Sequence, residues 1–207
     1  MAAPTCALSG SGGRTDRRMS RRSDGSFLDR GPKLSHDVDQ NPGLGYGVAM
    51  SDLLFVLTLL AALGSGLMAG LFFAFSNSIM QALAKRPAPV GIAAMQSIDE
   101  TILNPVFFLV FFGTALIGLV LAVMALIGWE GAGSAWRLAG GLLYLVGSIG
   151  ITMAFNVPLN NRLAKAVPES AEGATFWSQY VSVWTAWNHA RTLGCLGATG
   201  SFILGMP

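Results

Sequence analysis

The chain contains few charged residues: Asp, Glu, Lys and Arg together make up 12% of its 207 residues. Soluble domains carry about 25% of these residues, so the composition excludes an ordinary soluble domain. Seven of the 13 Lys and Arg residues precede Met50, and the rest of the chain has six basic and six acidic residues. The net charge of +2 therefore belongs to the N-terminal segment, and nucleic-acid binding is not indicated.

Cysteine is equally scarce. Cys6 stands in a polar N-terminal segment and Cys195 in an apolar run, so neither a disulfide framework nor a Cys/His metal site is predicted. The sequence also lacks a phosphate-binding loop, a haem-attachment signature and the spacing of a Ser or Cys triad. We therefore expect no metal and no cofactor, and an energy-coupled pump is not indicated.

Residues 1–49 form a segment of low hydrophobicity, rich in Gly, Ser, Arg and Asp and without periodicity. This composition predicts a disordered basic tail, and it lacks the apolar stretch of a secretory signal. The following string, Met50-Ser-Asp-Leu-Leu-Phe, resembles the natural start of a membrane protein. The tail is then either an artefact of an upstream start site, which we favour, or a genuine extension.

Long apolar runs dominate residues 50–207. About 20 apolar residues cross a hydrocarbon core about 30 Å thick, and we place such segments at residues 53–75, 105–127, 138–157 and 187–204. Small residues recur in all of them, which allows helix backbones to approach closely in lipid. The expected fold is therefore all-α, a four-transmembrane-helix bundle preceded by the disordered tail.

The two long connections between these segments are expected to carry short amphipathic helices. Residues 91–103 place apolar side chains on one helix face: Ile92, Met95, Ile98 and Ile102. Residues 174–187 lead into the last segment and contain aromatic residues typical of a membrane–water interface: Phe176, Trp177, Tyr180 and Trp184. The same connections hold more basic residues than the short turn near Arg137, which predicts that they face the cytoplasm. The basic tail argues for the opposite orientation, but most of its Arg residues lie far from the first segment.

Three polar strings interrupt the apolar runs. Asn104-Pro105 opens the second segment, Asn156-Val-Pro-Leu-Asn160 closes the third, and Trp184-Thr-Ala-Trp-Asn-His-Ala-Arg191 opens the fourth. Polar groups at membrane depth are costly and commonly functional. If the helices alternate in direction, all three strings meet at one end of the bundle, which predicts a polar pocket there.

The third string supplies the predicted catalytic residues His189, Arg191 and Asn188. Trp184, Asn188 and Arg191 recur at i, i+4 and i+7 and share one helix face, whereas His189 points about 100° away from Asn188. Imidazole titrates near neutral pH, which suits a general base. The competing interpretation makes His189 a satisfied interfacial residue and the Trp and Arg side chains membrane anchors.

The predicted substrate-binding residues are Asn104, Asn156, Asn160, Trp184 and Trp187. Structural alternatives remain open for several of them. Asn104 can be the N-cap of a helix that begins at Pro105. The other two asparagines can satisfy carbonyls freed by Pro158, and Trp187 can form a cation–π contact with Arg191. Asp99 can cap a helix, face water or pair with Arg191.

Taken together, several strings resemble the anthrone-oxygenase-like family of small membrane proteins across residues 52–205. They are Gly66-Leu-Met-Ala-Gly-Leu-Phe-Phe-Ala-Phe-Ser76, Met95-Gln-Ser-Ile, Asn104-Pro-Val-Phe and the second and third polar strings. The resemblance implies oxidation of polyketide anthrones to anthraquinones without an obvious cofactor, as in fungal relatives. This chain is similar to the bacterial type, mostly known as a domain of unknown function. Asp99 departs from the family pattern, which has Asn after the Met-Gln string.

Two functions follow as hypotheses. The first is a cofactor-independent oxygenase of a lipophilic phenolic or anthrone-like compound, with His189 as the base, Arg191 and the asparagines stabilising an anion, and Trp184 stacking on the substrate. The second is a non-enzymatic membrane scaffold, subunit or small carrier. Both place the chain, as a multi-pass protein, in a bacterial inner membrane with lipid as its partner. Neither involves nucleic acid, and the sequence leaves oligomerisation open.

Overall fold

The computed structural model describes residues 42–207, with side chains from residue 47 onward. Every regular element in this range is a helix, which confirms the predicted all-α class. Helix α2 (Pro42–Ala74) begins eight residues before Met50. Pro42 takes its first position, where the fixed φ of proline is already helical. The tail predicted at residues 1–49 otherwise lies outside the described residues.

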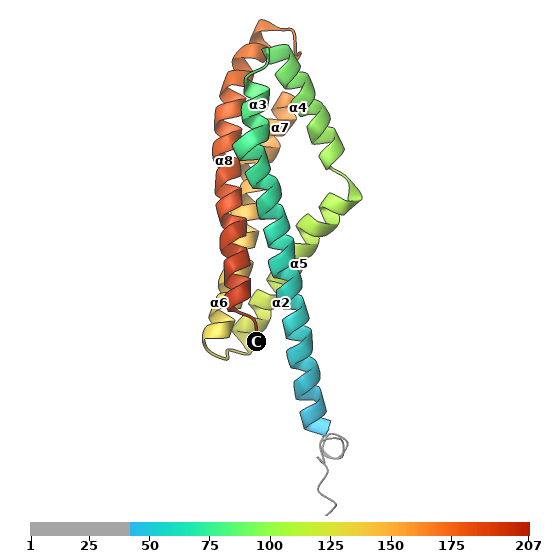
Figure 1. Cartoon of the computed structure of the whole chain (residues 1–207), viewed down its shortest axis with the longest axis vertical. Helices are drawn as coiled ribbons and strands as arrows, with labels where there is room; N and C mark the ends of the chain where they lie inside the picture. The colour runs from blue at the N-terminus through green and yellow to red at the C-terminus, as the bar shows by residue number, and fades with distance from the viewer. Residues whose placement is uncertain (1–41) are drawn as a thin grey trace, which may run out of the picture. The chain divides into compact units, whose positions relative to one another are not determined.

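Helix α2 continues without a break through the π-helical turn η1 (Phe75–Ile79) and α3 (Met80–Ala84). After a short turn, α4 (Ala88–Ile102) runs back along this end of the helix, and a bend leads into α5 (Pro105–Ile127), as Figure 1 shows. α5 has the same bounds as the expected second segment. The bend exists because Leu103 leaves the helical conformation and Pro105 starts a new helix.

The next continuous helix contains four elements. It begins with α6 (Ala132–Tyr144), passes through the π-helical turns η2 (Leu145–Gly150) and η3 (Thr152–Asn156), and ends with α7 (Val157–Leu163). The last helix, α8 (Ala171–Leu204), begins at the N-cap Ser170, whose hydroxyl accepts a hydrogen bond from the Gly173 amide at 2.9 Å. π-Helical turns are rare and frequently mark functional sites.

Within the residues that the structure describes, three stretches are long and apolar enough to cross a membrane: Gly47–Ala84, Pro105–Ile127 and Ala132–Leu163. This finding supports an integral membrane protein. The expected fourth segment, residues 187–204, is helical as part of α8, but α8 does not reach the same hydropathy. The mean hydropathy of α8 is lowered by polar side chains such as Asn188 and Arg191, which are buried inside the protein.

One of the two predicted connection helices is present as expected. α4 buries Ile92 and Met95, and Ile98 and Ile102 pack beside them. Residues 174–187 are helical as predicted, but the prediction that their aromatic side chains lie at a membrane–water interface is wrong. This stretch is the first half of α8, and Phe176, Trp177, Tyr180 and Trp184 are at most 8% exposed, so they form a core instead of an interfacial belt.

Glycine pairs set the closest approaches between helices. α6 packs against both α5 and α8. A Cβ on Gly141 would lie 2.5 Å from the carbonyl oxygen of Gly118 in α5, and one on Gly147 would lie 2.9 Å from the Cα of Gly194 in α8. Such contacts are available only to backbones without side chains, and they maximise dispersion between helices in lipid.

Two apolar cores result from this packing. The first joins α2, α5, α6 and α8 around residues such as Met68, Leu121 and Phe202. The second joins η1, α3, α4, α7 and the first half of α8 around Ile92 and Tyr180. Together they leave a space near the bend between α4 and α5, where the polar strings meet.

Gly147→Ala is expected to destabilise the protein by about 1–3 kcal/mol, because the added methyl group meets backbone that cannot rotate away. Gly200→Ala in α8 is the matched control, since nothing lies within 4 Å of a Cβ there. The free energy of unfolding in detergent, measured for both variants, checks this. Equal stability of the two variants would contradict the close η2–α8 contact.

Candidate functional site

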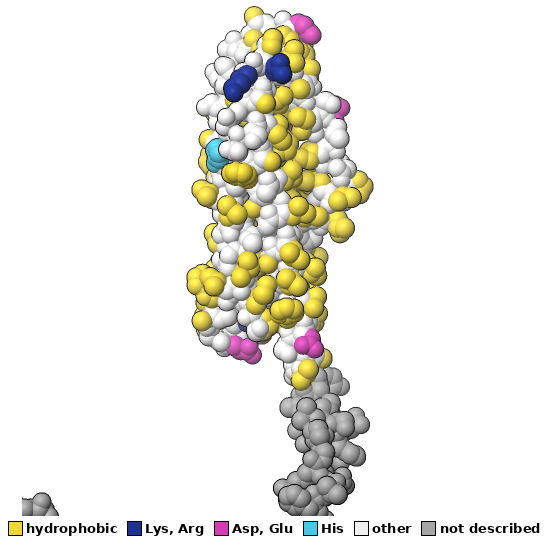
Figure 2. Space-filling model, viewed as in Figure 1, with side chains coloured by type: hydrophobic (Ala, Val, Ile, Leu, Met, Phe, Trp, Pro, Cys, Tyr) yellow, Lys and Arg dark blue, Asp and Glu magenta, His cyan; other side chains and the backbone are white. Residues whose placement is uncertain are grey.

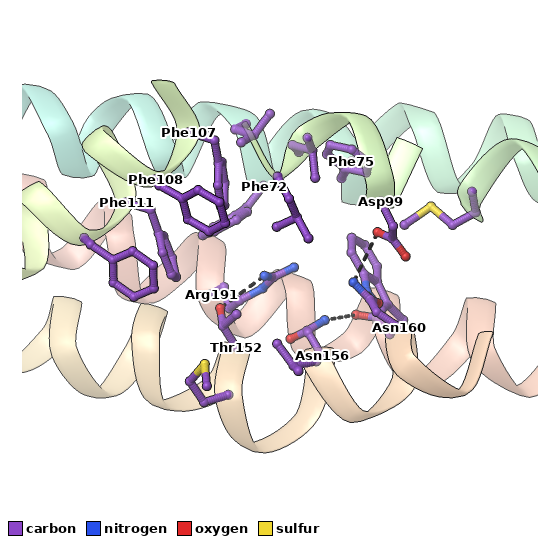
Figure 3. Close-up of a pocket in the computed structure, with 18 residues that line it drawn as sticks. Phe72, Phe75, Asp99, Phe107, Phe108, Phe111, Thr152, Asn156, Asn160 and Arg191 are labelled. Atoms are coloured by element: carbon purple, nitrogen blue, oxygen red, sulfur yellow. Dashed lines mark hydrogen bonds between the residues drawn. The ribbon is translucent and has the colours of Figure 1, made fainter. Parts of the chain in front are cut away.

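A cavity of about 170 Å³ lies between the two cores. Its walls come from α2 and η1, the end of α4, the start of α5, η3, α7 and α8. Figure 3 shows Phe107, Phe108 and Phe111 on one side and Arg191, Asn156 and Asn160 on the other. An apolar cavity of about 150 Å³ holds a benzene ring, so this one accommodates at least one aromatic ring.

Among the described residues, Arg191 is the only cation that lines this cavity. Its side chain is 6% exposed. The guanidinium donates hydrogen bonds to the Thr152 hydroxyl at 3.2 Å and to the side-chain carbonyl oxygen of Asn188. The guanidinium also lies 4.2 Å from the ring centre of Phe72 and 5.3 Å from that of Trp184. Hydrogen bonds and cation–π contacts therefore compensate for burying this charge.

Asn188 lies behind Arg191 and does not line the cavity, contrary to a direct catalytic role. It is fully buried and donates to the Phe72 carbonyl and to the Ser76 hydroxyl. These two acceptors flank the start of η1, where the backbone hydrogen bonds change to the i→i+5 pattern. Asn188 therefore links α8 to the π-helical turn and orients Arg191.

Asn160 connects the aromatic core to Asp99. Its carbonyl oxygen accepts from the Tyr180 hydroxyl at 2.9 Å and from the Trp184 indole N–H at 2.8 Å. An indole N–H can only donate, so it fixes which end of the Asn160 amide is the oxygen. The amide nitrogen then points to Asp99 and donates to its carboxylate at 3.1 Å.

Asp99, in the last turn of α4, is the only carboxylate from the described part of the chain that lines the cavity. Burial raises the pKa of this side chain from 3.8 to about 6, and the nearby charge of Arg191 opposes part of the rise. The sequence left open a pair between Asp99 and Arg191, and the structure relates these two residues less directly. Asp99 accepts a hydrogen bond from Asn160, and the two charges act on each other across the cavity.

Two polar atoms at the cavity are left without a partner among the described residues. They are the Nε of Arg191 and the side-chain carbonyl oxygen of Asn156. Asn156 is 1% exposed, and its amide nitrogen donates to the Trp184 carbonyl at 3.4 Å. An unpaired buried donor and acceptor are costly, so their presence in the wall of a cavity indicates a place for a polar group of a ligand.

His189 does not join this cluster, so the prediction that it lies in the pocket is wrong. Its side chain is exposed and is not part of the cavity wall. A histidine side chain is visible at the surface in Figure 2, and His189 is the histidine of the described residues. Two residues along a helix correspond to a rotation of about 200°, so His189 and Arg191 occupy nearly opposite faces of α8.

Trp187 and Asn104 also lie outside the cavity wall. Trp187 stacks on Phe155 with ring centres 3.6 Å apart, and its expected partner Arg191 lies over Phe72 and Trp184 instead. Asn104 is the N-cap of α5, where its side-chain oxygen accepts from the amides of Val106 and Phe107 at 3.1 Å. Its amide is thus used for capping, the structural alternative.

The cavity wall therefore contains Asn156, Asn160, Trp184 and Arg191 from the predicted set. Sequence analysis missed Asp99 as a site residue, although its departure from the family pattern and its proximity to Arg191 were signals. It also missed Thr152 and the phenylalanines. The spacing of Phe107, Phe108, Phe111 and Phe112 was an available signal, because it places aromatic rings on one side of the first two turns of α5.

Within residues 42–207, no group of three His, Cys, Asp or Glu side chains is arranged to hold a metal ion. Residues 107–201 match a protein family described as anthrone oxygenase. The match confirms the resemblance inferred from the sequence strings. No curated protein and no solved structure gives a significant match.

Asn188→Leu is expected to destabilise the protein by about 2 kcal/mol or more, because it removes one hydrogen-bond partner from the buried Arg191 guanidinium and one from the Phe72 carbonyl. Asn161→Leu, at an exposed position of α7, is the control. The free energy of unfolding in detergent provides the comparison. A loss no larger than that of the control would show that the Asn188 network does not stabilise the fold.

The pH dependence of stability is expected to carry the signature of Asp99. Its pKa is about 6 in the folded protein and near 3.8 in the unfolded chain, so between these values the folded state retains a proton that the unfolded state has lost. Stability therefore falls as pH rises from about 4 to 6. Thermal unfolding of Asp99→Asn should lack this component, and the exposed Glu100→Gln should keep it. A profile that is unchanged in Asp99→Asn would rule out a buried, titrating carboxylate.

Proposed function

We propose that this chain, whose residues 107–201 match the anthrone oxygenase family, is a membrane-embedded oxygenase that uses O₂ to oxidise a lipophilic phenolic or anthrone-like compound without a cofactor. One observation carries the proposal. A cavity with aromatic walls contains a single carboxylate, Asp99, and a single buried cation, Arg191.

The proposal includes four membrane-crossing segments in a bacterial inner membrane, with α8 as the fourth. The polar residues of α8 that lower its hydropathy, Asn188 and Arg191 among them, are buried within the protein. The outward side of the same helix carries Leu193, Leu196 and Ile203, which are more than half exposed. A helix with its polar face hidden and an apolar face outward is compatible with lipid.

Asp99 takes the role that the sequence suggested for His189. A carboxylate with a pKa of about 6 is ionised at neutral pH and close to the range in which a general base is most effective. It lines the cavity directly, whereas His189 is exposed. Asn160 holds the carboxylate in place through its hydrogen bond of 3.1 Å.

The reaction needs few groups. The Asp99 carboxylate removes a proton from the acidic carbon of the anthrone, and the charge spreads to the substrate oxygen. The free Nε–H of Arg191 stabilises that oxyanion, and the free oxygen of Asn156 accepts from a phenolic hydroxyl. The carbanion gives its electron pair to O₂ and forms a C–O bond. The resulting peroxide anion takes a proton back, and the hydroperoxide loses water, so one anthrone and one O₂ yield one quinone and one water.

A second candidate is a carrier or scaffold that binds a similar compound without transforming it. This candidate is favoured because three asparagine amides bind other parts of the protein instead of pointing to a ligand. Asn104 caps α5, Asn188 binds the backbone and Arg191, and Asn160 binds two aromatic side chains and Asp99. The same cavity then provides a binding site in which Asp99 takes no part in chemistry.

The test is oxidation of a simple anthrone by the purified protein in detergent, with and without O₂, over the spontaneous rate. Asp99→Asn is expected to lower kcat by about 10²–10⁴-fold, the usual contribution of a general base. The rate of the wild type should rise with pH through about 6, as the carboxylate ionises. Glu100→Gln and His189→Ala, both at exposed positions, serve as controls that keep the rate.

Loss of activity in His189→Ala with full activity in Asp99→Asn would contradict the assignment of the base. No O₂-dependent oxidation above the spontaneous rate, with tight binding of the anthrone retained, would favour the carrier.

A further inference from the structure

The cavity has an apolar opening at its side. Four residues of its wall are also exposed at the protein surface: Leu103, Phe108, Phe112 and Met153, with exposed fractions of 58%, 40%, 48% and 56%. They come from the bend before α5, the first two turns of α5, and η3. The rim of this opening therefore carries apolar side chains only.

This apolar opening lies at the level of the bilayer. α5 is one of the stretches long enough to cross a membrane, and Phe112 is its eighth residue. At a rise of about 1.5 Å per residue, Phe112 lies about 10 Å along a helix about 35 Å long. The neighbouring outward residues Leu109 and Leu116 are 73% and 64% exposed, so the rim continues into an apolar surface.

A second opening carries polar side chains beside apolar ones. A cleft of about 320 Å³ between α4 and α7 shares five residues with the cavity: Asp99, Ile102, Leu103, Val157 and Asn160. Its remaining lining consists of Gln96, Glu100, Asn161 and Ala164. Gln96 holds this cleft in shape, because its amide donates to the carbonyls of Leu163 and Ala166 at 2.8 and 3.0 Å. α7 is the last part of the membrane-crossing stretch Ala132–Leu163, and α4 is not among these stretches, so the cleft lies where that stretch ends.

We propose that these two openings serve different molecules. Flat apolar ligands enter the cavity directly from the bilayer, between α5 and η3, and water reaches Asp99 through the polar cleft between α4 and α7. The role of Asp99 as a base rests on the proposed function, but the two routes do not. In an oxygenase, the cleft lets the carboxylate pass the proton it has taken to water, while the substrate and its anion stay in the apolar part.

The first measurement follows the apolar route with anthracene, a flat ligand that lacks an acidic carbon. The full chain is placed in lipid nanodiscs, and stopped-flow energy transfer from tryptophan to anthracene reports association, with empty nanodiscs as the background. Met153→Phe, which adds a ring at the rim, is expected to slow association several-fold. Leu109→Phe, on the outward face of α5, and Asn161→Phe, at the polar cleft, should leave it unchanged.

The second measurement follows the polar route. Asp99→Cys is prepared with Cys6→Ser, leaving Cys195, which is fully buried. A cationic methanethiosulfonate reagent added to the water should modify residue 99. Adding Asn161→Phe is expected to slow this reaction several-fold, whereas adding Met153→Phe should not.

The crossed pattern supports the proposal, since each obstruction then slows one probe only. Asn161→Phe slowing anthracene, or Met153→Phe leaving its association unchanged, would overturn the bilayer route. A cysteine at position 99 that resists the reagent would overturn the water route. Both probes are independent of turnover, so a protein that follows this pattern and yet fails to oxidise an anthrone would refute the oxygenase and leave the two routes standing.

Discussion

The structure depends on the burial of one positive charge, that of Arg191, inside an apolar protein. A guanidinium removed from water is tolerated only if its donors and its face find partners. Arg191 finds them on two other segments, at Thr152 in η3 and Phe72 in α2, and at Asn188 one turn away in its own helix α8. The need to solvate this cation therefore ties together the helices that form the cavity.

The same constraint organises the charges of the site. Asn188 binds Arg191 on one side and the start of η1 on the other, so the cation is held from behind, and its Nε has no partner among the described residues. The carboxylate of Asp99 lies at the other, polar end, held by Asn160. The carboxylate and the cation thus line one cavity, whose other walls are largely aromatic. This arrangement suits the removal of a proton from an apolar molecule.

The pattern of residues in α8 illustrates how far sequence alone could go. The i, i+4, i+7 spacing placed Trp184, Asn188 and Arg191 on one face, and that face is buried. His189 was included because of its chemistry, although the same periodicity puts it about 100° from Asn188. In a similar way, the aromatic residues of 174–187 suit either an interface or a core, because an indole or phenol ring is apolar with one polar atom. Their burial depends on α4 covering them.

The sequence by itself determined the helical class, the bounds of α5, the amphipathic face of α4 and the helix start at Asn104, because each depends on neighbours within a turn or two along the chain. Only the tertiary structure decided that Asp99 belongs to the cavity, that Asn188 supports Arg191 from behind, and that the cavity opens both to an apolar surface and to a polar cleft. These features depend on contacts between residues 60 or more positions apart, such as Asn160 with Asp99 and Asn188 with Phe72. Helical periodicity shows which side chains share a face, but only the packing of the helices determines which residues that face contacts.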